Sequence, residues 1–276
     1  MHLPYNSSNA IHESRGENTA SSRGTVPVAN ASANTKGTWT NLGAATSFAY
    51  EGITIYAFSN TAAADYMIDI GVSDGSNRYV LVADLHFAAA KQAEEHNLAM
   101  FVPVHVADGA QLSVRVACST GGSDCDVIVV GHSSNPGGFP GYSRAVALFT
   151  PASSRGIAVD PGGTSNTKGS WAELTSSCPS DIDAIFGVVG FNGDTGRGLT
   201  VSMLMDIGIG AASNEFTVVP NLSLCWGATW DGPNDVFFQP LAASIPTGTR
   251  IAARAQSSDN TAGDRSADLS LYGLVA

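Results

Sequence analysis

Apolar and polar residues alternate along much of the chain with a period of two. In LSVRV at 112–116, for example, the apolar side chains occupy every second position. This period is typical of a β-strand with one face in a hydrophobic core. Turn signals such as DG at 108–109, NGD at 192–194 and PTG at 246–248 separate these segments. The pattern therefore predicts many short strands joined by turns.

An internal repeat organises the chain. SSRG at 21–24 recurs at 153–156, and NTKG at 34–37 recurs at 166–169, each 132 residues further along. Further matched pairs, with offsets that grow to 139, are Trp39 with Trp171, Leu42 with Leu174, Asp69 with Asp206, Gly109 with Gly248 and Arg115 with Arg254. Collinear matches of this kind indicate two copies of one domain.

The repeat divides the chain into four parts. The two copies span 21–131 and 153–276, and a polar N-terminal arm at 1–20 precedes them. We expect this arm to be disordered in isolation and to order, if at all, on a neighbouring subunit. A Gly/Pro-rich connector at 132–152 ends in the apolar run 145–149, which predicts packing against a domain or a partner.

Each copy contains about eight predicted strands. They lie at 24–28, 39–42, 52–58, 66–72, 79–87, 99–105, 111–117 and 126–130, and at 156–159, 171–174, 184–191, 200–209, 215–222, 236–241, 250–256 and 267–274. The segment 88–97, rich in helix formers, is compatible with one short helix. This spacing predicts an all-β protein of two tandem β-sandwich domains, each jelly-roll-like.

Composition narrows the function classes. Charged residues make up 13% of the chain, against about 25% in typical soluble domains. The net charge is −11 and the sequence pI is about 4.7, which argues against broad nucleic-acid binding and against adsorption to an anionic membrane. The chain contains no run of about 18 apolar residues, and its first ten residues do not resemble a secretory signal peptide.

The four cysteines, Cys118, Cys125, Cys178 and Cys225, form no CxxC pair. A chain of this length does not need disulfides to fold, which favours reduced thiols. Cys118 and Cys125 flank a turn, so a disulfide across this hairpin stays open as an alternative.

Duplication provides a control for catalytic residues, because a site needed in both copies should be matched. The six histidines all lie in the first copy, its arm or the connector, and His86 and His96 lack a second ligand pair at metal-binding spacing. No GxSxG motif is present. The matched Asp69 and Asp206 are each expected to satisfy a strand end or a turn amide. We predict no catalytic residue, no metal and no cofactor.

Two unmatched tryptophans stand out in the second copy. Trp226 and Trp230 belong to the segment CWGATWDGPND, in which Asp231, Asn234 and Asp235 follow. The two indole rings suit either packing at a subunit interface or stacking on a sugar ring. The acidic and amide oxygens offer ligands for Ca²⁺, although they match no EF-hand pattern. Both roles, ligand site and subunit interface, stay open.

The second copy resembles β-rich virion proteins of tailed bacteriophages. The runs that carry the resemblance are VDPGGTSNTKGSWAEL, MDIGIGAASNE and PTGTRIAARAQSSDNTAGDR, followed by a final LYG. The resemblance covers most of 153–276 and, through the repeat, extends more loosely to 21–131. It implies a non-enzymatic structural protein, either a capsid decoration (cement) protein or a tail or fibre component, and it transfers no catalytic residues.

We therefore expect a virion protein, made in the bacterial cytoplasm, that self-associates as a homotrimer and contacts other virion proteins. The alternative is a carbohydrate-binding adhesin that recognises a host-surface glycan through Trp226 and Trp230. A glycan-degrading enzyme would require two carboxylates converging in one cleft, and the sequence does not indicate such a pair.

Overall fold

The computed structural model describes residues 11–18, 23–59, 64–73, 77–88, 97–134, 140–151, 154–191, 201–226, 236–261 and 266–276. In these ranges the regular secondary structure consists of β-strands. The strands are β1 (His12–Arg15), β2 (Glu17–Asn18), β3 (Arg23–Gly24), β4 (Thr40–Asn41), β5 (Gly52–Ser59), β6 (Asp65–Ser73), β7 (Arg78–Ala88), β8 (Asn97–Val102), β9 (Gln111–Cys118), β10 (Cys125–His132), β11 (Arg144–Ala147), β12 (Ile157–Val159), β13 (Ala172–Thr175), β14 (Ile182–Phe191), β15 (Val201–Ile209), β16 (Phe216–Trp226), β17 (Val236–Ile245), β18 (Ile251–Ser257) and β19 (Ala267–Val275).

The first sandwich is a jelly roll of two facing sheets. One sheet has the strand order β1-β10-β5-β8, and the other contains β7-β6-β9-β4. From β4 onward, strands consecutive in the chain alternate between the sheets, except that β6 and β7 form a hairpin. This double Greek-key order is the jelly-roll arrangement, in which both sheets enclose one hydrophobic core.

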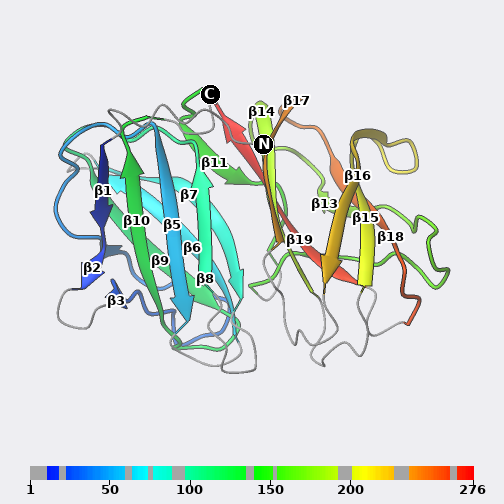
Figure 1. Cartoon of the computed structure of the whole chain (residues 1–276), viewed down its shortest axis with the longest axis horizontal. Coiled ribbons are helices and arrows are strands. Elements are labelled where there is room, and N and C mark those ends of the chain that lie inside the picture. The colour runs from blue at the N-terminus through cyan, green and yellow to red at the C-terminus, as the bar shows by residue number, and fades with distance from the viewer. Residues whose placement is uncertain are drawn as a thin grey trace.

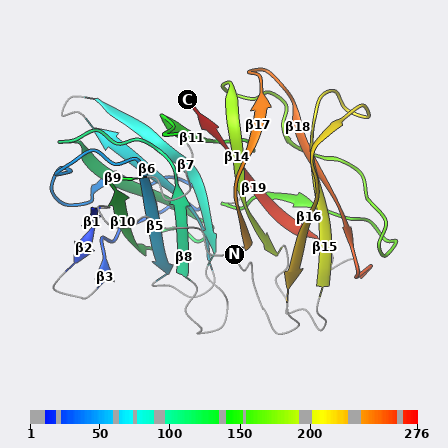
Figure 2. The same cartoon turned by 45° about the horizontal axis from the view of Figure 1, so that its top comes forward.

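The second sandwich repeats this order. Strands β11 and β12 both pair with β19, which continues to β14 and β17, and the facing sheet is β13-β18-β15-β16. Figures 1 and 2 show the two sandwiches side by side. The predicted fold class, all-β with two tandem jelly-roll-like sandwiches, is confirmed, and every predicted strand overlaps an observed strand.

One sheet runs through both sandwiches. Strand β11 pairs antiparallel with β19 from Arg144↔Val275 to Ala147↔Tyr272, and it also pairs in parallel with β7 at Ala145↔Val82. The result is the continuous order β17-β14-β19-β11-β7-β6-β9-β4. Strand β11 therefore joins the two copies into one body. The apolar run at 145–149, predicted to pack against a domain or a partner, begins in this strand.

The parts predicted as an arm and a connector differ from the structure at three places, one of which is the short strand β2 at 17–18 of the arm, paired with β3. Residues 12–15 of the arm form β1, which pairs with β10 from His12↔His132 to Arg15↔Val129. Residues 144–147 of the connector form β11 at the equivalent place of the second sandwich. The polar composition of 12–15 concealed the first strand, because its side chains are held by hydrogen bonds and an ion pair. The suggested helix at 88–97 lies almost entirely outside the described residues.

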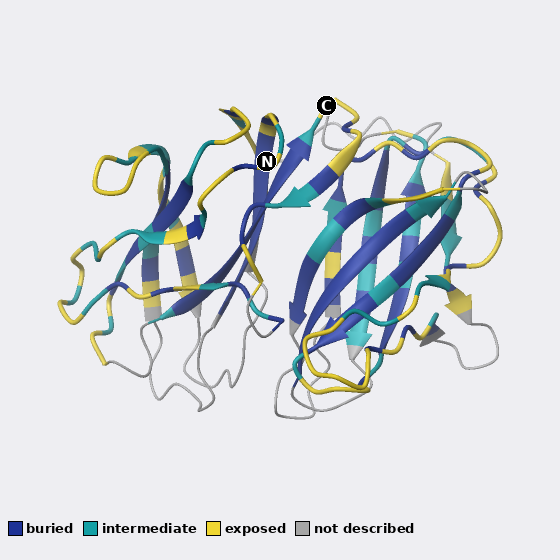
Figure 3. Ribbon diagram, turned by 180° about the vertical axis from the view of Figure 1, so that it is seen from behind, coloured by how far each residue is buried: buried dark blue, intermediate teal, exposed yellow. Residues whose placement is uncertain are grey.

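Burial differs between the sheet that contains β5 in the first sandwich and the equivalent sheet that contains β14 in the second. In β5, Ile53, Ile55 and Ala57 are fully buried, whereas the residues between them are half-buried. In β14, every residue from Ala184 to Gly190 is buried. The first sheet therefore has one face in a core and one face open, and the second has both faces covered. Figure 3 shows the resulting continuous buried colour on the strands between the two sandwiches.

Candidate functional site

The matched aspartates form the same polar cluster in both copies. The Oδ1 atom of Asp69 accepts hydrogen bonds from the Lys36 Nζ and from the backbone N–H of Asp84, both at 2.8 Å. Its Oδ2 atom accepts one from the Arg115 Nε at 2.8 Å. Asp84 has a φ of 51° and interrupts the β6–β7 register, so Asp69 satisfies the amide of a β-bulge. The sequence led us to expect a strand end or a turn amide as the donor, whereas the amide bound by Asp69 lies at a bulge inside β7.

Asp206 repeats this geometry in the second copy. It accepts hydrogen bonds from the Lys168 Nζ at 2.7 Å, the Asn221 N–H at 2.9 Å and the Arg254 Nε at 2.9 Å. Burial alone would raise the pKa of Asp206, but these donors and the charge of Lys168 lower it below its usual range. A carboxylate held by two cations and an amide is suited to fixing the bulge rather than to moving a proton.

The matched tryptophans complete each cluster. Trp39 lies so close over Gly71 that a Cβ there would come within 2.8 Å of the ring, and the Arg115 guanidinium sits 4.5 Å from the ring centroid. Trp171 has the same relation to Gly208, with Arg254 at 4.6 Å. In each copy, the tryptophan precedes the first strand of a sheet (β4 or β13). By packing on the glycine and stacking with the arginine, it holds this segment against the outer face of that sheet.

A second polar cluster lies between the two sandwiches. Asp65, at the start of β6, accepts a hydrogen bond from the Arg155 Nε at 2.6 Å and lies 3.5 Å from the His86 Nε2. The opposite ring nitrogen of His86, Nδ1, is 3.2 Å from the Ser270 Oγ on β19. Burial would raise the pKa of Asp65, but His86 and Arg155 lower it. Two residues from each sandwich therefore meet in this cluster.

Tyr272 closes the same junction. Its hydroxyl accepts a hydrogen bond from the His86 N–H and donates one to the Asp84 carbonyl, both at 2.8 Å. Its ring stacks on Phe186 with centroids 4.9 Å apart and meets Phe149 edge-on at 5.7 Å. The ring therefore fills the core side of the junction while its hydroxyl satisfies two backbone groups of β7.

Ser270, His86 and Asp65 are the side-chain types of a hydrolytic triad. Hydrolysis requires that a substrate reach the serine oxygen. Ser270 and His86 are fully buried, and Tyr272 lies against them. The arrangement is therefore suited to joining the sandwiches. The sequence did not indicate it, because its members are unmatched between the copies and lie far apart in the chain.

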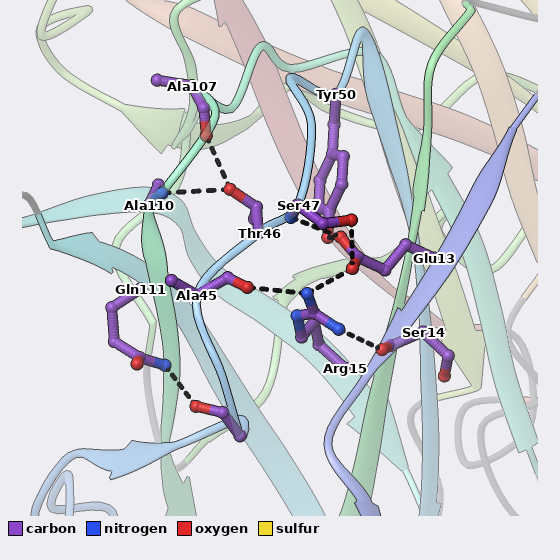
Figure 4. A network of polar contacts seen from close by, with 11 residues as sticks. Glu13, Ser14, Arg15, Ala45, Thr46, Ser47, Tyr50, Ala107, Ala110 and Gln111 are labelled. Atoms are coloured by element: carbon purple, nitrogen blue, oxygen red, sulfur yellow. Dashed lines mark hydrogen bonds and ion pairs between the residues drawn. The ribbon is translucent and has the colours of Figure 1, made fainter.

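A third network attaches β1 to the first sandwich (Figure 4). The Glu13 carboxylate accepts hydrogen bonds from the Tyr50 hydroxyl at 2.6 Å and from the Ser47 Oγ at 2.7 Å and N–H at 3.0 Å, and it pairs with Arg15. Arg15 also donates to the Ala45 carbonyl at 2.7 Å. Burial would raise the pKa of Glu13, but Ser47, Tyr50 and Arg15 lower it from 4.5 to about 2.

The residues singled out as a ligand or interface site are only partly described. The backbone of Trp226 ends β16 opposite Val201. The Trp226 side chain and all of Trp230, Asp231 and Asp235 lie outside the described residues, as does His96. His86 belongs to the junction described above. All four cysteines are free thiols, and Cys118 and Cys125 are both buried without forming the hairpin disulfide.

Within the described ranges, no three His, Cys, Asp or Glu side chains converge as a metal site would require. The same ranges contain no helix with the length and apolar character needed to cross a bilayer.

Neither a family model nor a curated protein sequence matches the chain. Solved structures resemble it distantly. The tandem CBM22-1–CBM22-2 domain of Paenibacillus barcinonensis Xyn10C is 11% identical over 98% of this chain and 92% of its own, with a TM-score of 0.26. The empty top component of cowpea mosaic virus is 8% identical over 97% and 90%, with a TM-score of 0.28. The PBSX exported protein XepA is 10% identical over 95% and 86%, with a TM-score of 0.24.

Proposed function

We propose that the chain is a non-enzymatic structural protein of a tailed bacteriophage virion, which self-associates on the particle surface as a capsid decoration protein or as a tail or fibre component. The observation that carries the proposal is the sheet shared by the two sandwiches through β11. Together with the buried Asp65–His86–Ser270 cluster, it joins the two sandwiches into one body. Rigid blocks of this kind suit a shell or fibre that must keep its geometry.

The sequence adds the second support. The runs in 153–276 resemble β-rich virion proteins, and the low fraction of charged residues, 13%, suits surfaces that other subunits cover. The net charge of −11 would keep the unassembled chain soluble until it finds its partners.

The experiment is a proteomic count on purified particles. Particles of the phage that encodes the chain are banded on a density gradient and digested, and peptides of this chain are quantified against the major capsid protein. The proposal expects a fixed copy number per particle that survives repeated banding. Absence of the peptides from intact particles, with the chain found only in the lysate, would overturn it.

A carbohydrate-binding adhesin is the second candidate, and one feature of the described residues favours it. Tyr79 on β7 and Phe216 on β16 occupy matched positions, 137 residues apart, and are 58% and 71% exposed. Exposed aromatic rings that recur once per domain suit stacking on sugar rings. A glycan array tests it: binding must be lost in Tyr79→Ala with Phe216→Ala or in Trp226→Ala with Trp230→Ala, and an array without any signal excludes this function.

A further inference from the structure

The contact between the two sandwiches uses surfaces that each copy of the repeat possesses. In the second copy the contact is made by the outer face of the β19–β14 sheet, and in the first copy by β7 and its neighbour β6. The first copy therefore also has an outer β10–β5 face, and the second copy also has a β15–β16 edge. Among the described residues, no strand pairing between the two sandwiches uses either of these surfaces.

The unused face can be defined residue by residue from the strand register. Phe186 pairs with Tyr272 and Val188 with Ser270 in the second copy, and all four are buried against the first sandwich. The equivalent pairs in the first copy are Thr54↔Val130 and Tyr56↔Ile128. These four residues, the open face, are only half-buried. In Figures 1 and 2, β10 and β5 lie at the front of the first sandwich, with no strand of the second sandwich in front of them.

The unused edge is defined in the same way. At the junction, Met67 pairs with His86 and Ile68 with Leu85, and all four are fully buried. The equivalent pairs in the second copy are Leu204↔Ser223 and Met205↔Leu222. Leu204 and Leu222 are half-buried and Ser223 is exposed, and these three residues form the open edge. Leu222 lies opposite the buried Met205 and packs partly against the core of its own sandwich. Leu204 and Ser223 lie opposite each other on the outer face, so they are the part of the open edge that corresponds to Met67 and His86 at the junction.

The two open surfaces are complementary in character. None of the seven residues that define the two surfaces is charged, and the Lys168 ammonium beside Leu204 is paired with Asp206. Where the internal junction meets His86 with Ser270 and Tyr272, the open surfaces would meet the small Ser223 with Ile128 and Val130. A hydrogen-bonded polar cluster is thus replaced by apolar side chains opposite a small residue, which leaves no buried charge without a partner.

The edge strand does not prevent such a contact. Pro220 stands where the first copy has Ala83, so one backbone N–H is missing from β16. Within the chain, however, the β7–β11 ladder consists of the single pair Ala145↔Val82, so the junction depends on side chains rather than on a long ladder. A proline at the edge therefore costs the equivalent contact little.

We propose that the open edge of one copy docks on the open face of a second copy, so that the junction within the chain is repeated between chains. This inference rests on the proposed self-association and specifies its geometry. The contact is heterologous, because the two surfaces differ, so it propagates head to tail and closes into a ring where the rotation allows. A ring of three chains would place six sandwiches around one axis, in agreement with the expected homotrimer.

Two variants of the full chain test the contact. Ser223→Arg places a long cation on the open edge, and Val130→Arg places one on the open face. Ser170→Arg, at an exposed position that belongs to neither surface, is the matched control. Each variant is checked for its thermal unfolding midpoint and then measured by native mass spectrometry and light scattering over a range of concentrations. We expect each of the two variants to weaken association on the order of 30-fold or more, and the control to assemble as the natural chain does.

Mixing the two variants gives the decisive result. A Ser223→Arg chain keeps its open face and a Val130→Arg chain keeps its open edge, so a one-to-one mixture should form a heterodimer that stops at two chains. If the natural chain assembles but either variant assembles equally well, the proposed contact is wrong and self-association stands. If the mixture stays monomeric while the natural chain assembles, the contact is also wrong. If the natural chain is monomeric at every concentration, both the contact and the proposed self-association are wrong.

Discussion

At the scale of single residues, Asp69 and Asp206 show how a buried carboxylate serves a fold. Each carboxylate accepts hydrogen bonds from the backbone N–H of a β-bulge and from two cationic side chains, at 2.7–2.9 Å. Sequence reasoning found these aspartates because the repeat matches them together with Arg115 and Arg254. It did not bring Asp65, His86 and Ser270 together, because unmatched residues in different copies meet only in the folded junction.

The carboxylate of Asp206 should be important for stability. Asp206→Asn removes the negative charge that Lys168 and Arg254 face, and it places an amide NH₂ against one of the three hydrogen-bond donors. We therefore expect the free energy of unfolding to fall by about 2 kcal/mol. Urea denaturation measures it. Asp108→Asn, at an exposed turn, is the control and should change stability by less than about 0.5 kcal/mol. Equal stability of both variants would mean that the cluster contributes nothing.

The Tyr272 hydroxyl should contribute to the junction through its two hydrogen bonds. Tyr272→Phe keeps the ring stacked on Phe186 but leaves the His86 N–H and the Asp84 carbonyl without this partner. We expect a loss of about 1–3 kcal/mol by urea denaturation. Tyr79→Phe, at an exposed tyrosine, should be neutral. A neutral Tyr272→Phe would show that the hydroxyl is dispensable.

At the scale of elements, periodicity and turn signals predicted sixteen strands, and all of them overlap observed strands, including β14, which is buried on both faces. They did not predict β1, β2 or β11. The β1 sequence HESR has no apolar side chain, so a hydrophobic period cannot reveal it. The Glu13 and Arg15 side chains hold the strand instead, through hydrogen bonds with Ser47, Tyr50 and the Ala45 carbonyl. In β11 the run is apolar on both faces because it lies inside a sheet between two sandwiches, so the period of two disappears.

The attachment of β1 should depend on pH. The pKa of Glu13 falls from 4.5 to about 2 on folding, so its contribution is fully present above about pH 4.5 and is lost as the pH falls toward 2. Glu13→Gln should therefore lower stability at pH 7 and flatten the stability profile between pH 4.5 and pH 2. Amide hydrogen exchange of residues 12–15 and chemical denaturation across this range measure it. A variant profile parallel to that of the natural chain would exclude the role of Glu13.

At the scale of the whole molecule, the shared sheet makes one body of two domains. Tandem domains joined by a linker commonly unfold in separate steps. Here β11 belongs to both sandwiches and the junction is buried, so we expect a single calorimetric transition with equal calorimetric and van't Hoff enthalpies. Differential scanning calorimetry measures it. Two resolved transitions would show that the sandwiches are energetically independent and would remove the basis for a rigid building block.

Self-association is the central claim, and the mass of the full chain in solution tests it most directly. Light scattering coupled to size-exclusion chromatography, over a hundredfold range of concentration, should find a species of about 85 kDa, three times the 28.3 kDa of one chain. Association should survive added salt, because the open face and the open edge carry no charge and screening reduces the repulsion between chains of net charge −11. A mass of 28.3 kDa at every concentration and salt would contradict the account.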